Sequence, residues 1–295
     1  AWSGRRCTQT CCVDRCVPCL TRMPCVTHAS YALYPVYLTF LSFSTPPMGT
    51  DANQAAIHNV VVTLDTHHKL HIAHAAFWQS GTDAAVRPAP FSLISSEDIA
   101  EGKWVPRNSA LTSYCVEYTR ALEAGGKFQL IIWPEHCLQG SLGHAVVAPV
   151  REALDRWIDA HAERGVTVQY VLKGQNCLTE MYSALSAEVP VPTDPSTALN
   201  TELRRMLLPT PFHAGATQKL IVCGQAKSHC VAATLLDVVR AATAEECAAI
   251  TLLDDCTSSV AGFEAAAEAF AADMRGRGVH IAKAAEVALQ ADATK

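Results

Sequence analysis

The sequence lacks the features of a membrane protein, of a nucleic-acid-binding protein and of a disordered chain. The apolar residues 31–43 include Pro35 and are too few to cross a bilayer, which takes about 20 residues. The net charge is −5 and no stripe of lysine or arginine is present, which argues against a nucleic-acid partner. Low-complexity tracts and internal repeats are also missing. We therefore expect neither a membrane nor a nucleic-acid partner, and one large α/β domain.

Cysteine is distributed unevenly along the chain. Of the 13 cysteines, six lie in the first 25 residues, namely Cys7, Cys11, Cys12, Cys16, Cys19 and Cys25. Their spacing suits a metal site, a redox site or a small disulfide module. From Met48 onward the chain is rich in alanine and valine, so we interpret residues 1–47 as a segment not native to the fold, from a misassigned reading frame or start. Residues 48–295 form the predicted domain, whose scattered cysteines fit a cytoplasmic location.

Residues 219–237 predict a buried strand, a tight turn and a helix. The apolar run 220–223 is short and β-branched, and Gly224 ends it. Ser228 is the predicted N-cap of a helix whose apolar residues recur at helical spacing. Cys230 then lies near the helix N-terminus, where the dipole and free N–H groups favour a thiolate and lower the thiol pKa. The alternative interpretation is a buried structural cysteine.

Polar side chains follow three further strand-like runs. The runs and the side chains behind them are residues 60–64 with Asp65, His67, His71 and His74, residues 129–132 with Trp133 and His136, and residues 167–172 with Lys173. Sites in open α/β sheets are built outside the carboxyl ends of the strands. We therefore expect these side chains to meet Cys230 at one edge of a parallel, doubly wound sheet in a three-layer α/β/α fold.

These residues resemble the isochorismatase-like cysteine hydrolases and, within that family, the nicotinamidases. The resemblance extends from about Val60 to Ala266 and rests on five motifs whose order and spacing match. They are TLDTHHKLHIAH at 63–74, IWPEHC at 132–137, VLKG at 171–174, CGQAKSHCV at 223–231 and LLDDCTSSVAGFE at 252–264. The resemblance implies the isochorismatase-like hydrolase fold and a hydrolase that acts on a small amide.

The resemblance also implies a role for each matching residue. Cys230 matches the nucleophile that attacks an amide carbonyl, and Lys173 matches the lysine whose charge holds the thiolate and the developing oxyanion. The backbone N–H groups of Ala226 and Cys230 match the oxyanion hole, with a cis peptide expected between Gln225 and Ala226. Trp133 matches a residue that flanks the substrate ring.

A divalent metal is implied by the same resemblance. Asp65, His67 and His136 match the metal ligands of the nicotinamidase branch, in which the metal takes the pyridine nitrogen. Both His71 and His74 lie where some members place a further ligand, and the branch that this chain most resembles favours His74. Oxygen and imidazole ligands suit zinc, iron or manganese, of which zinc is our first expectation.

Three neighbouring polar residues have simpler interpretations. We expect His68 to be a solvated loop residue and His144 to be a hydrogen-bonded helix residue. Glu180 follows the strand that carries Lys173, and it either caps a helix or lines the pocket.

One residue of the family pattern has no counterpart here. These hydrolases begin with a central strand that ends in an aspartate, which takes the thiol proton as general base. This chain has no acidic residue between Asp14 and Asp51, and neither of these two fits the pattern. If the apolar run described above fills the central position, then Ser42, Ser44 and Thr45 stand where the aspartate is expected. A hydroxyl cannot serve as that base.

We therefore predict a metal-assisted cysteine amidohydrolase of nicotinamidase type, which converts nicotinamide and water to nicotinate and ammonia through a thioester on Cys230. One alternative is a hydrolase of another small amide, and the other is a non-catalytic family member that has lost its base. Residues 189–211 contain five prolines and predict a loop around a short helix at 199–207. This loop covers the site or meets a second subunit of a homo-oligomer.

Overall fold

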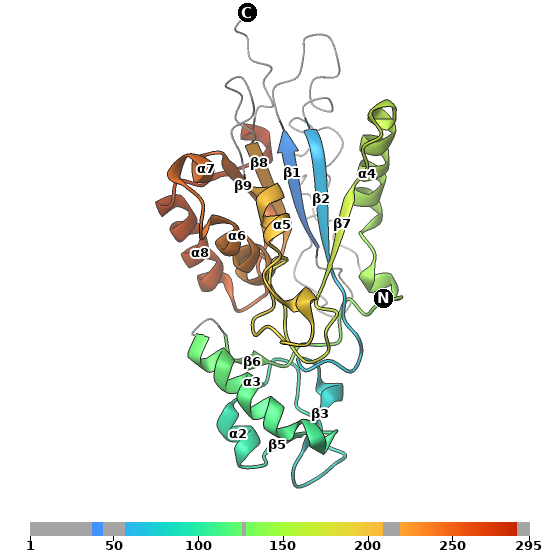
Figure 1. Cartoon of the computed structure of the whole chain (residues 1–295), viewed down its shortest axis with the longest axis vertical. Helices are drawn as coiled ribbons and strands as arrows, with labels where there is room; N and C mark the ends of the chain where they lie inside the picture. The colour runs from blue at the N-terminus through green and yellow to red at the C-terminus, as the bar shows by residue number, and fades with distance from the viewer. Residues whose placement is uncertain (1–36, 44–56, 126–127, 209–218, 288–295) are drawn as a thin grey trace, which may run out of the picture.

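A mixed six-stranded sheet forms the centre of the protein. The computed structural model describes residues 37–43, 57–125, 128–208 and 219–287, and within these ranges the strand order is β10-β9-β8-β1-β2-β7 (Figure 1). The strands are β1 (Tyr37–Phe43), β2 (Ile57–Asp65), β7 (Gln169–Lys173), β8 (Lys219–Gln225), β9 (Ile250–Ser258) and β10 (His280–Ala282). The buried β-branched runs predicted at 60–64 and 220–223 lie inside β2 and β8.

Helices cover both faces of this sheet, because successive strand residues point to opposite sides. Val62 of β2 packs in one buried cluster with Leu154 of α4. Its neighbour Val61 packs in another cluster, with Leu235 of α6 and Phe270 of α8. The covering helices, which flank the sheet in Figure 1, are α4 (Ala148–Ala160), α5 (Thr201–Leu207), α6 (Ala232–Val239), α7 (Ala244–Ala248) and α8 (Glu264–Gly276). The predicted three-layer α/β fold is confirmed, including the short helix near residue 203.

The direction of the central strand departs from the prediction of an all-parallel sheet. The pairs β10–β9, β8–β9 and β2–β7 are parallel, but β1 runs antiparallel to both β2 and β8. Tyr37 lies opposite Leu64, and Leu38 lies opposite Gly224. The amino end of β1 is therefore at the edge of the sheet where β2 and β8 end.

This direction overturns the expected position of one hydroxyl residue. Ser42 pairs with Asn59 near the start of β2, at the edge far from the carboxyl ends of β2 and β8. The prediction that Ser42 stands where the family has its aspartate is wrong, because an apolar run carries no information about its direction in a sheet. Ser44 and Thr45 lie outside the described residues.

The N-terminal segment 1–47, which the sequence analysis interpreted as not native to the fold, contributes this central strand. Strand β1 falls within residues 1–47, whose other residues lie outside the described ranges. Asp14 and Asp51 lie outside those ranges as well. The sequence analysis therefore separated from the domain a segment that supplies hydrogen bonds to two strands of its sheet.

A smaller lobe lies below the main sheet in Figure 1. It contains two-stranded sheets and two helices, namely β3 (Trp78–Ser80) with β5 (Trp104–Pro106), β4 (Leu93–Ile94) with β6 (Leu130–Ile131), α2 (Ser96–Ala100) and α3 (Thr112–Gly125). The run 129–132 was expected to end in the main sheet, but β6 pairs with β4 instead. The residues that follow β6 still reach the end of β2, because the His67 N–H, two residues after that strand, donates to the Cys137 carbonyl at 3.1 Å.

Single helical turns connect these elements. They are η1 (Ala75–Phe77), η2 (Ser109–Leu111), η3 (Leu142–His144), η4 (Ala162–Arg164), η5 (Pro195–Thr197), η7 (Ala284–Glu286) and the π-helical turn η6 (Lys227–Val231). The last of these joins β8 to α6. It is the turn that carries Cys230.

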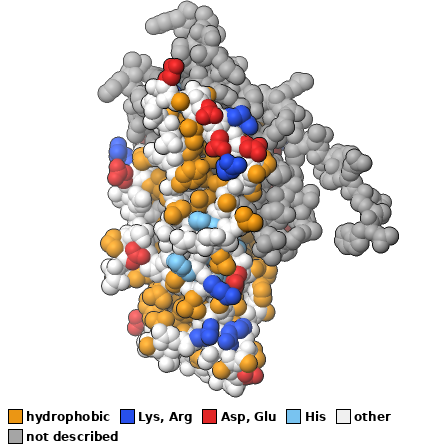
Figure 2. Space-filling view, turned by 90° about the vertical axis from the view of Figure 1, so that its right-hand side faces the viewer, with side chains coloured by type: hydrophobic (Ala, Val, Ile, Leu, Met, Phe, Trp, Pro, Cys, Tyr) orange, Lys and Arg blue, Asp and Glu red, His pale blue; other side chains and the backbone are white. Residues whose placement is uncertain are grey.

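The charged surface shows no continuous stripe of one sign on the face drawn in Figure 2, where acidic and basic side chains lie near one another. No helix among the described residues is both long enough and apolar enough to cross a bilayer. The expected absence of nucleic-acid and membrane partners, the homo-oligomer and the cytoplasmic location stay predictions.

The packing of α4 against the sheet gives a first test, with two leucines as a matched pair. Leu154 is fully buried and Leu142 is 95% exposed. We expect Leu154→Ala to lower the free energy of unfolding by about 2–5 kcal/mol because it leaves a cavity. Leu142→Ala should change it by less than about 0.5 kcal/mol. Urea unfolding measures both, and equal effects would contradict this packing.

Candidate active site

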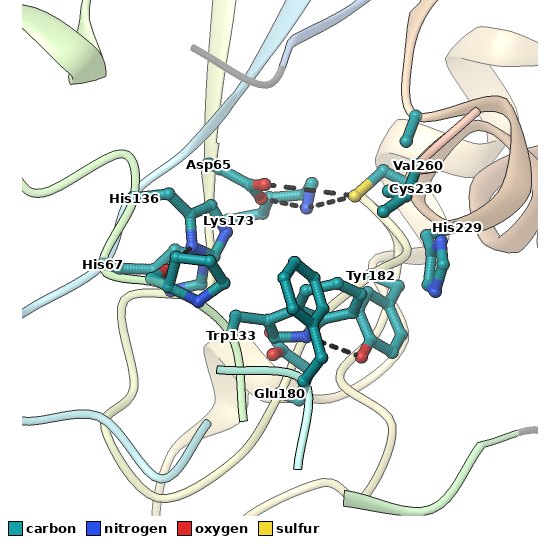
Figure 3. Close-up of a pocket in the computed structure, with 13 residues that line it drawn as sticks. Asp65, His67, Trp133, His136, Lys173, Glu180, Tyr182, His229, Cys230 and Val260 are labelled. Carbon is teal, nitrogen blue, oxygen red and sulfur yellow. Dashed lines mark hydrogen bonds and ion pairs between the residues drawn. The ribbon is translucent and has the colours of Figure 1, made fainter. Parts of the chain in front are cut away.

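A cavity of about 120 Å³ lies at the carboxyl ends of β2, β7 and β8. Its walls include most of the predicted site residues, namely Asp65, His67, Trp133, His136, Lys173, Ala226 and Cys230. Figure 3 shows Asp65, Lys173 and Cys230 along one side, with His67 and His136 at one end. The strand-end argument therefore brought the right side chains together, although β6 belongs to a different sheet.

The Lys173 ammonium is the most completely bonded group of the site. The side chain is 2% exposed, and its Nζ donates to Asp65 Oδ1, to the Met181 carbonyl at 2.9 Å and to Cys230 Sγ at 3.4 Å. An ammonium has three protons, so all of its donors are used. Burial lowers the pKa of Lys173, but the charge of Asp65, together with that of Cys230 when it is a thiolate, outweighs burial and raises it above its usual value. Lys173 is therefore a fixed positive charge beside the sulfur.

The Cys230 thiol is buried in this structure, and its acidity differs from the prediction. Burial raises the pKa of Cys230 to about 12, and the opposing effect of Lys173 is smaller. The predicted lowering of the thiol pKa is wrong for this state, because removing a thiolate from water costs more than one neighbouring charge returns. The thiol donates to Asp65 Oδ2 at 3.9 Å. Asp65 therefore accepts from Cys230 through one oxygen and from Lys173 through the other.

The turn that carries Cys230 begins two residues earlier than predicted. The π-helical turn η6 starts at Lys227 with Ala226 as its N-cap, so the assignment of Ser228 as N-cap is wrong. Ser228 Oγ instead pairs with His229 Nδ1 at 2.9 Å and accepts from the Val260 N–H at 3.2 Å. The predicted cis peptide between Gln225 and Ala226 is confirmed.

Four histidine side chains form a cluster of contacting rings beside Asp65. The rings of His67, His71, His74 and His136 have centroids 4.7–5.5 Å apart in the five pairs that make contact. Burial, followed by the charges of neighbouring histidines, lowers the pKa of His67 far below its usual value. Burial also lowers the pKa of His74 to about 4. Both imidazoles are neutral at physiological pH, which is the form that binds metals.

Backbone carbonyls fix the tautomers of two of these rings. His136 Nδ1 lies 2.9 Å from the Pro134 carbonyl, and His74 Nδ1 lies 3.2 Å from the His68 carbonyl. A ring that donates from Nδ1 keeps the lone pair of Nε2 for a metal, which is the usual arrangement of histidine ligands. His71 differs, since its Nε2 lies 3.1 Å from the Thr179 carbonyl and its Nδ1 accepts from Ala73 at 3.2 Å. Hydrogen bonding thus favours His74 over His71 as the fourth ligand.

Distances among potential ligand atoms give a different grouping. Among the described residues, two sets of three have ligand atoms within 4.8 Å of one another, namely Asp65 with His67 and His136, and His67 with His71 and Glu180. The first set is the one that the family resemblance predicted. His74 belongs to neither set, so its role as a ligand stays a prediction.

Three buried polar atoms near these rings lack any hydrogen-bond partner. They are His67 Nδ1, His74 Nε2 and Glu180 Oε2. Buried polar atoms are nearly always paired, so unpaired ligand atoms within the histidine cluster fit the binding of a cation there. The donor set of imidazole and carboxylate suits Zn²⁺, Fe²⁺ or Mn²⁺. The residues therefore fit a divalent metal.

His68 and His144 have the surroundings that the sequence analysis expected, and the structure decides between the two alternatives for Glu180. His68 is exposed. His144 lies in η3, where its Nε2 pairs with Thr66 Oγ1 at 2.8 Å. Glu180 lines the cavity and caps no helix, so the pocket interpretation holds.

Aromatic side chains form the side of the cavity opposite Lys173. Trp133 Nε1 donates to Tyr182 Oη at 3.0 Å, as Figure 3 shows. His229 packs against both rings and stacks on Phe128, with ring centroids 4.8 Å apart. The sequence analysis missed Tyr182 and His229, although His229 directly precedes Cys230 and that adjacency was a usable signal. It also missed the Met181 carbonyl, which no side-chain pattern reveals.

Comparison with known proteins gives matches among solved structures alone. No protein-family model and no curated protein matches the chain. A nicotinamidase/pyrazinamidase of Acinetobacter baumannii is 18% identical, with 77% of both chains covered and a TM-score of 0.45. The yeast nicotinamidase Pnc1p is 18% identical over 76% of this chain and 79% of that chain, also with a TM-score of 0.45.

A third solved structure is a pyrazinamidase of Pyrococcus horikoshii in complex with zinc. It is 19% identical over 61% of this chain and 88% of that chain, with a TM-score of 0.33. All three are nicotinamidases or pyrazinamidases. That is the branch which the sequence motifs resemble, but likeness at this level assigns no activity. The function has to come from the site itself.

Gly174 supports the His67 ring and provides a test of the histidine cluster. Its φ is +79°, and an added Cβ would lie 2.9 Å from His67 Cε1. Gly165 has a similar φ of +64° with nothing within 4 Å, so Gly165→Ala is a matched control for backbone strain. We expect Gly174→Ala, unlike the control, to displace His67 and weaken Mn²⁺ binding, measured by chelator competition. Equal Mn²⁺ affinity in the two variants would contradict the support given by Gly174.

Burial of His229 predicts a pH-dependent stability. Burial lowers the pKa of His229 to about 4, whereas an unfolded histidine titrates near about 6.5. Between these values the unfolded chain binds a proton that the folded chain does not, so stability falls as pH decreases from 7 to 4.5. His229→Phe keeps the ring contacts without titrating. We expect the wild type to lose more unfolding free energy than this variant over that range, and equal losses would contradict the assignment.

Proposed function

We propose that this protein is a cysteine amidohydrolase that cleaves a small carboxamide, with Cys230 as the nucleophile. The observation that carries the proposal is the contact of one sulfur with a buried ammonium and a buried carboxylate on the wall of a small cavity. A purely structural cysteine has no need of a buried ion pair, which is costly to form. A nucleophilic thiol uses both partners, because one accepts its proton and the other stabilises the sulfur anion.

The proposed reaction has two steps. The thiol proton passes to Asp65 Oδ2, and the sulfur forms a bond to the amide carbonyl carbon, whose oxygen becomes an anion. The N–H groups of Ala226 and Cys230 are proposed to hold this oxyanion. The C–N bond then breaks, the nitrogen leaves as ammonia with the transferred proton, and a thioester remains. Water hydrolyses the thioester to the carboxylic acid and restores the thiol.

Asp65 is proposed as the proton acceptor because the family's own aspartate has no identified counterpart here. Among the described residues, its carboxylate is the one recorded in contact with Cys230 Sγ. A general base must lie within hydrogen-bonding reach of the proton that it takes, and Asp65 meets this condition. This role argues against the alternative of a non-catalytic protein.

A divalent metal is proposed at Asp65, His67 and His136, with His74 as a further ligand. The metal would supply a Lewis acid that binds a ring nitrogen of the substrate and orients it. Each carboxylate oxygen has more than one lone pair, so Asp65 can contact Lys173 and Cys230 and still serve a metal. Zinc, iron and manganese all suit this donor set.

Nicotinamide is the proposed substrate, on the basis of cavity size and lining. A cavity of about 120 Å³ suits a small molecule and no polymer. Trp133 and Tyr182 line the cavity and could stack on a planar ring, and the histidine end would take the ring nitrogen. Another small amide is the second candidate, and a panel with nicotinamide, pyrazinamide and benzamide distinguishes the two by ammonia release.

The nucleophile is tested with two buried cysteines. Ammonia release from nicotinamide should vanish in Cys230→Ala, because Cys230 carries the thiol among the described residues that line the cavity. Cys223 is buried in β8 and lines no part of the cavity, so Cys223→Ala should keep the activity of the wild type. Retained activity in Cys230→Ala would refute the mechanism. Circular dichroism of both variants checks that each one folds.

A further inference from the structure

Glu180 has no role in the proposed reaction, although it is buried in the cavity wall. The residue is 5% exposed, its Oε1 accepts from the Met181 N–H at 3.0 Å, and its Oε2 has no partner. The nearby ammonium of Lys173 gives its three protons to other acceptors. A buried carboxylate with no cation is costly, so Glu180 is either protonated or paired with a bound cation.

A second atom without a partner lies within reach of Glu180. His67 Nδ1 is buried and unpaired, and ligand atoms of Glu180, His67 and His71 lie within 4.8 Å of one another. Donors that bind one ion at about 2.0–2.2 Å lie at most about 4.4 Å apart, so three donors within 4.8 Å of one another need only small side-chain shifts to share an ion. Each unpaired atom exposes less than 1 Å² to solvent, so bulk water does not satisfy it.

We propose that the chain holds a second divalent cation between Glu180, His67 and His71, beside the one proposed at Asp65, His67 and His136. The two sites have the same chemistry, one carboxylate and two imidazoles, which suits Mn²⁺, Fe²⁺ or Zn²⁺. They share His67, which has two ring nitrogens and gives one to each ion, with release of its proton on binding.

The surroundings of His71 fit a role as ligand if the ion replaces one of the two hydrogen bonds of its ring. Its Nε2 donates to the Thr179 carbonyl at 3.1 Å, which fixes the ring and leaves the lone pair on Nδ1. That lone pair receives the Ala73 N–H at 3.2 Å, a long contact that the ion would replace. The first site makes no use of either Glu180 or His71.

Equilibrium binding of Mn²⁺ tests the proposal, with the free ion measured by electron paramagnetic resonance. Mn²⁺ is the right probe because the 13 cysteines would bind zinc elsewhere on the chain, whereas Mn²⁺ prefers oxygen and nitrogen. We expect two equivalents on the wild-type chain and one on Glu180→Gln, whose second affinity should fall by about 100-fold or more. The control Glu135→Gln removes an exposed carboxylate next to His136 and should keep both equivalents.

The remaining equivalent on Glu180→Gln, together with its circular dichroism spectrum, shows that the variant folds. One equivalent on the wild type, or two on Glu180→Gln, would overturn the proposal. Because binding is measured without substrate, its outcome does not depend on the proposed amidase activity. Two equivalents on a chain that releases no ammonia would uphold the second cation and refute the proposed function.

Discussion

The buried ammonium of Lys173 is the constraint on which the rest of the site depends. It joins three segments that are far apart in sequence, through Asp65 at the end of β2, Cys230 in η6 and the carbonyl of Met181. Removing Asp65 would leave this ammonium without a counter-charge away from water, at a cost of about 3–5 kcal/mol. The contact that holds these segments together is therefore the same one that prepares the sulfur, so stability and reactivity cannot be altered independently here.

The cavity divides its charge between two ends. Lys173 supplies a permanent positive charge at the sulfur. The histidine end consists of neutral rings, and two of their buried nitrogens, His67 Nδ1 and His74 Nε2, have no hydrogen-bond partner. Asp65 lies between the two ends and is the carboxylate that both require. In the proposed mechanism this one side chain would couple the state of the thiol to metal binding at the histidine cluster. Metal content and thiol chemistry should consequently be measured together in any study of this protein.

The sequence predicted which side chains meet in the cavity better than it predicted the burial and hydrogen bonds that set their pKa values and tautomers. Asp65, Lys173 and Cys230 were found because each follows a buried strand, and strand ends meet at one edge of a sheet. The prediction that the pKa of the Cys230 thiol is lowered was wrong, because this pKa depends on burial by side chains that are remote in sequence. The choice between His71 and His74 was equally out of reach, since it depends on which backbone carbonyl each ring meets. The direction of β1 has no signature in an apolar run.

The antiparallel direction of β1 bears on which parts of the chain build the sheet and which parts build the site. A parallel strand needs a crossover connection to reach its place, but an antiparallel one does not, so the central position of this sheet accepts a strand by backbone pairing alone. Every residue that lines the cavity comes from residues 65–260, outside β1. The central strand therefore acts on the site through its backbone pairing with β2 and β8, the two strands whose ends carry Asp65 and the turn with Cys230.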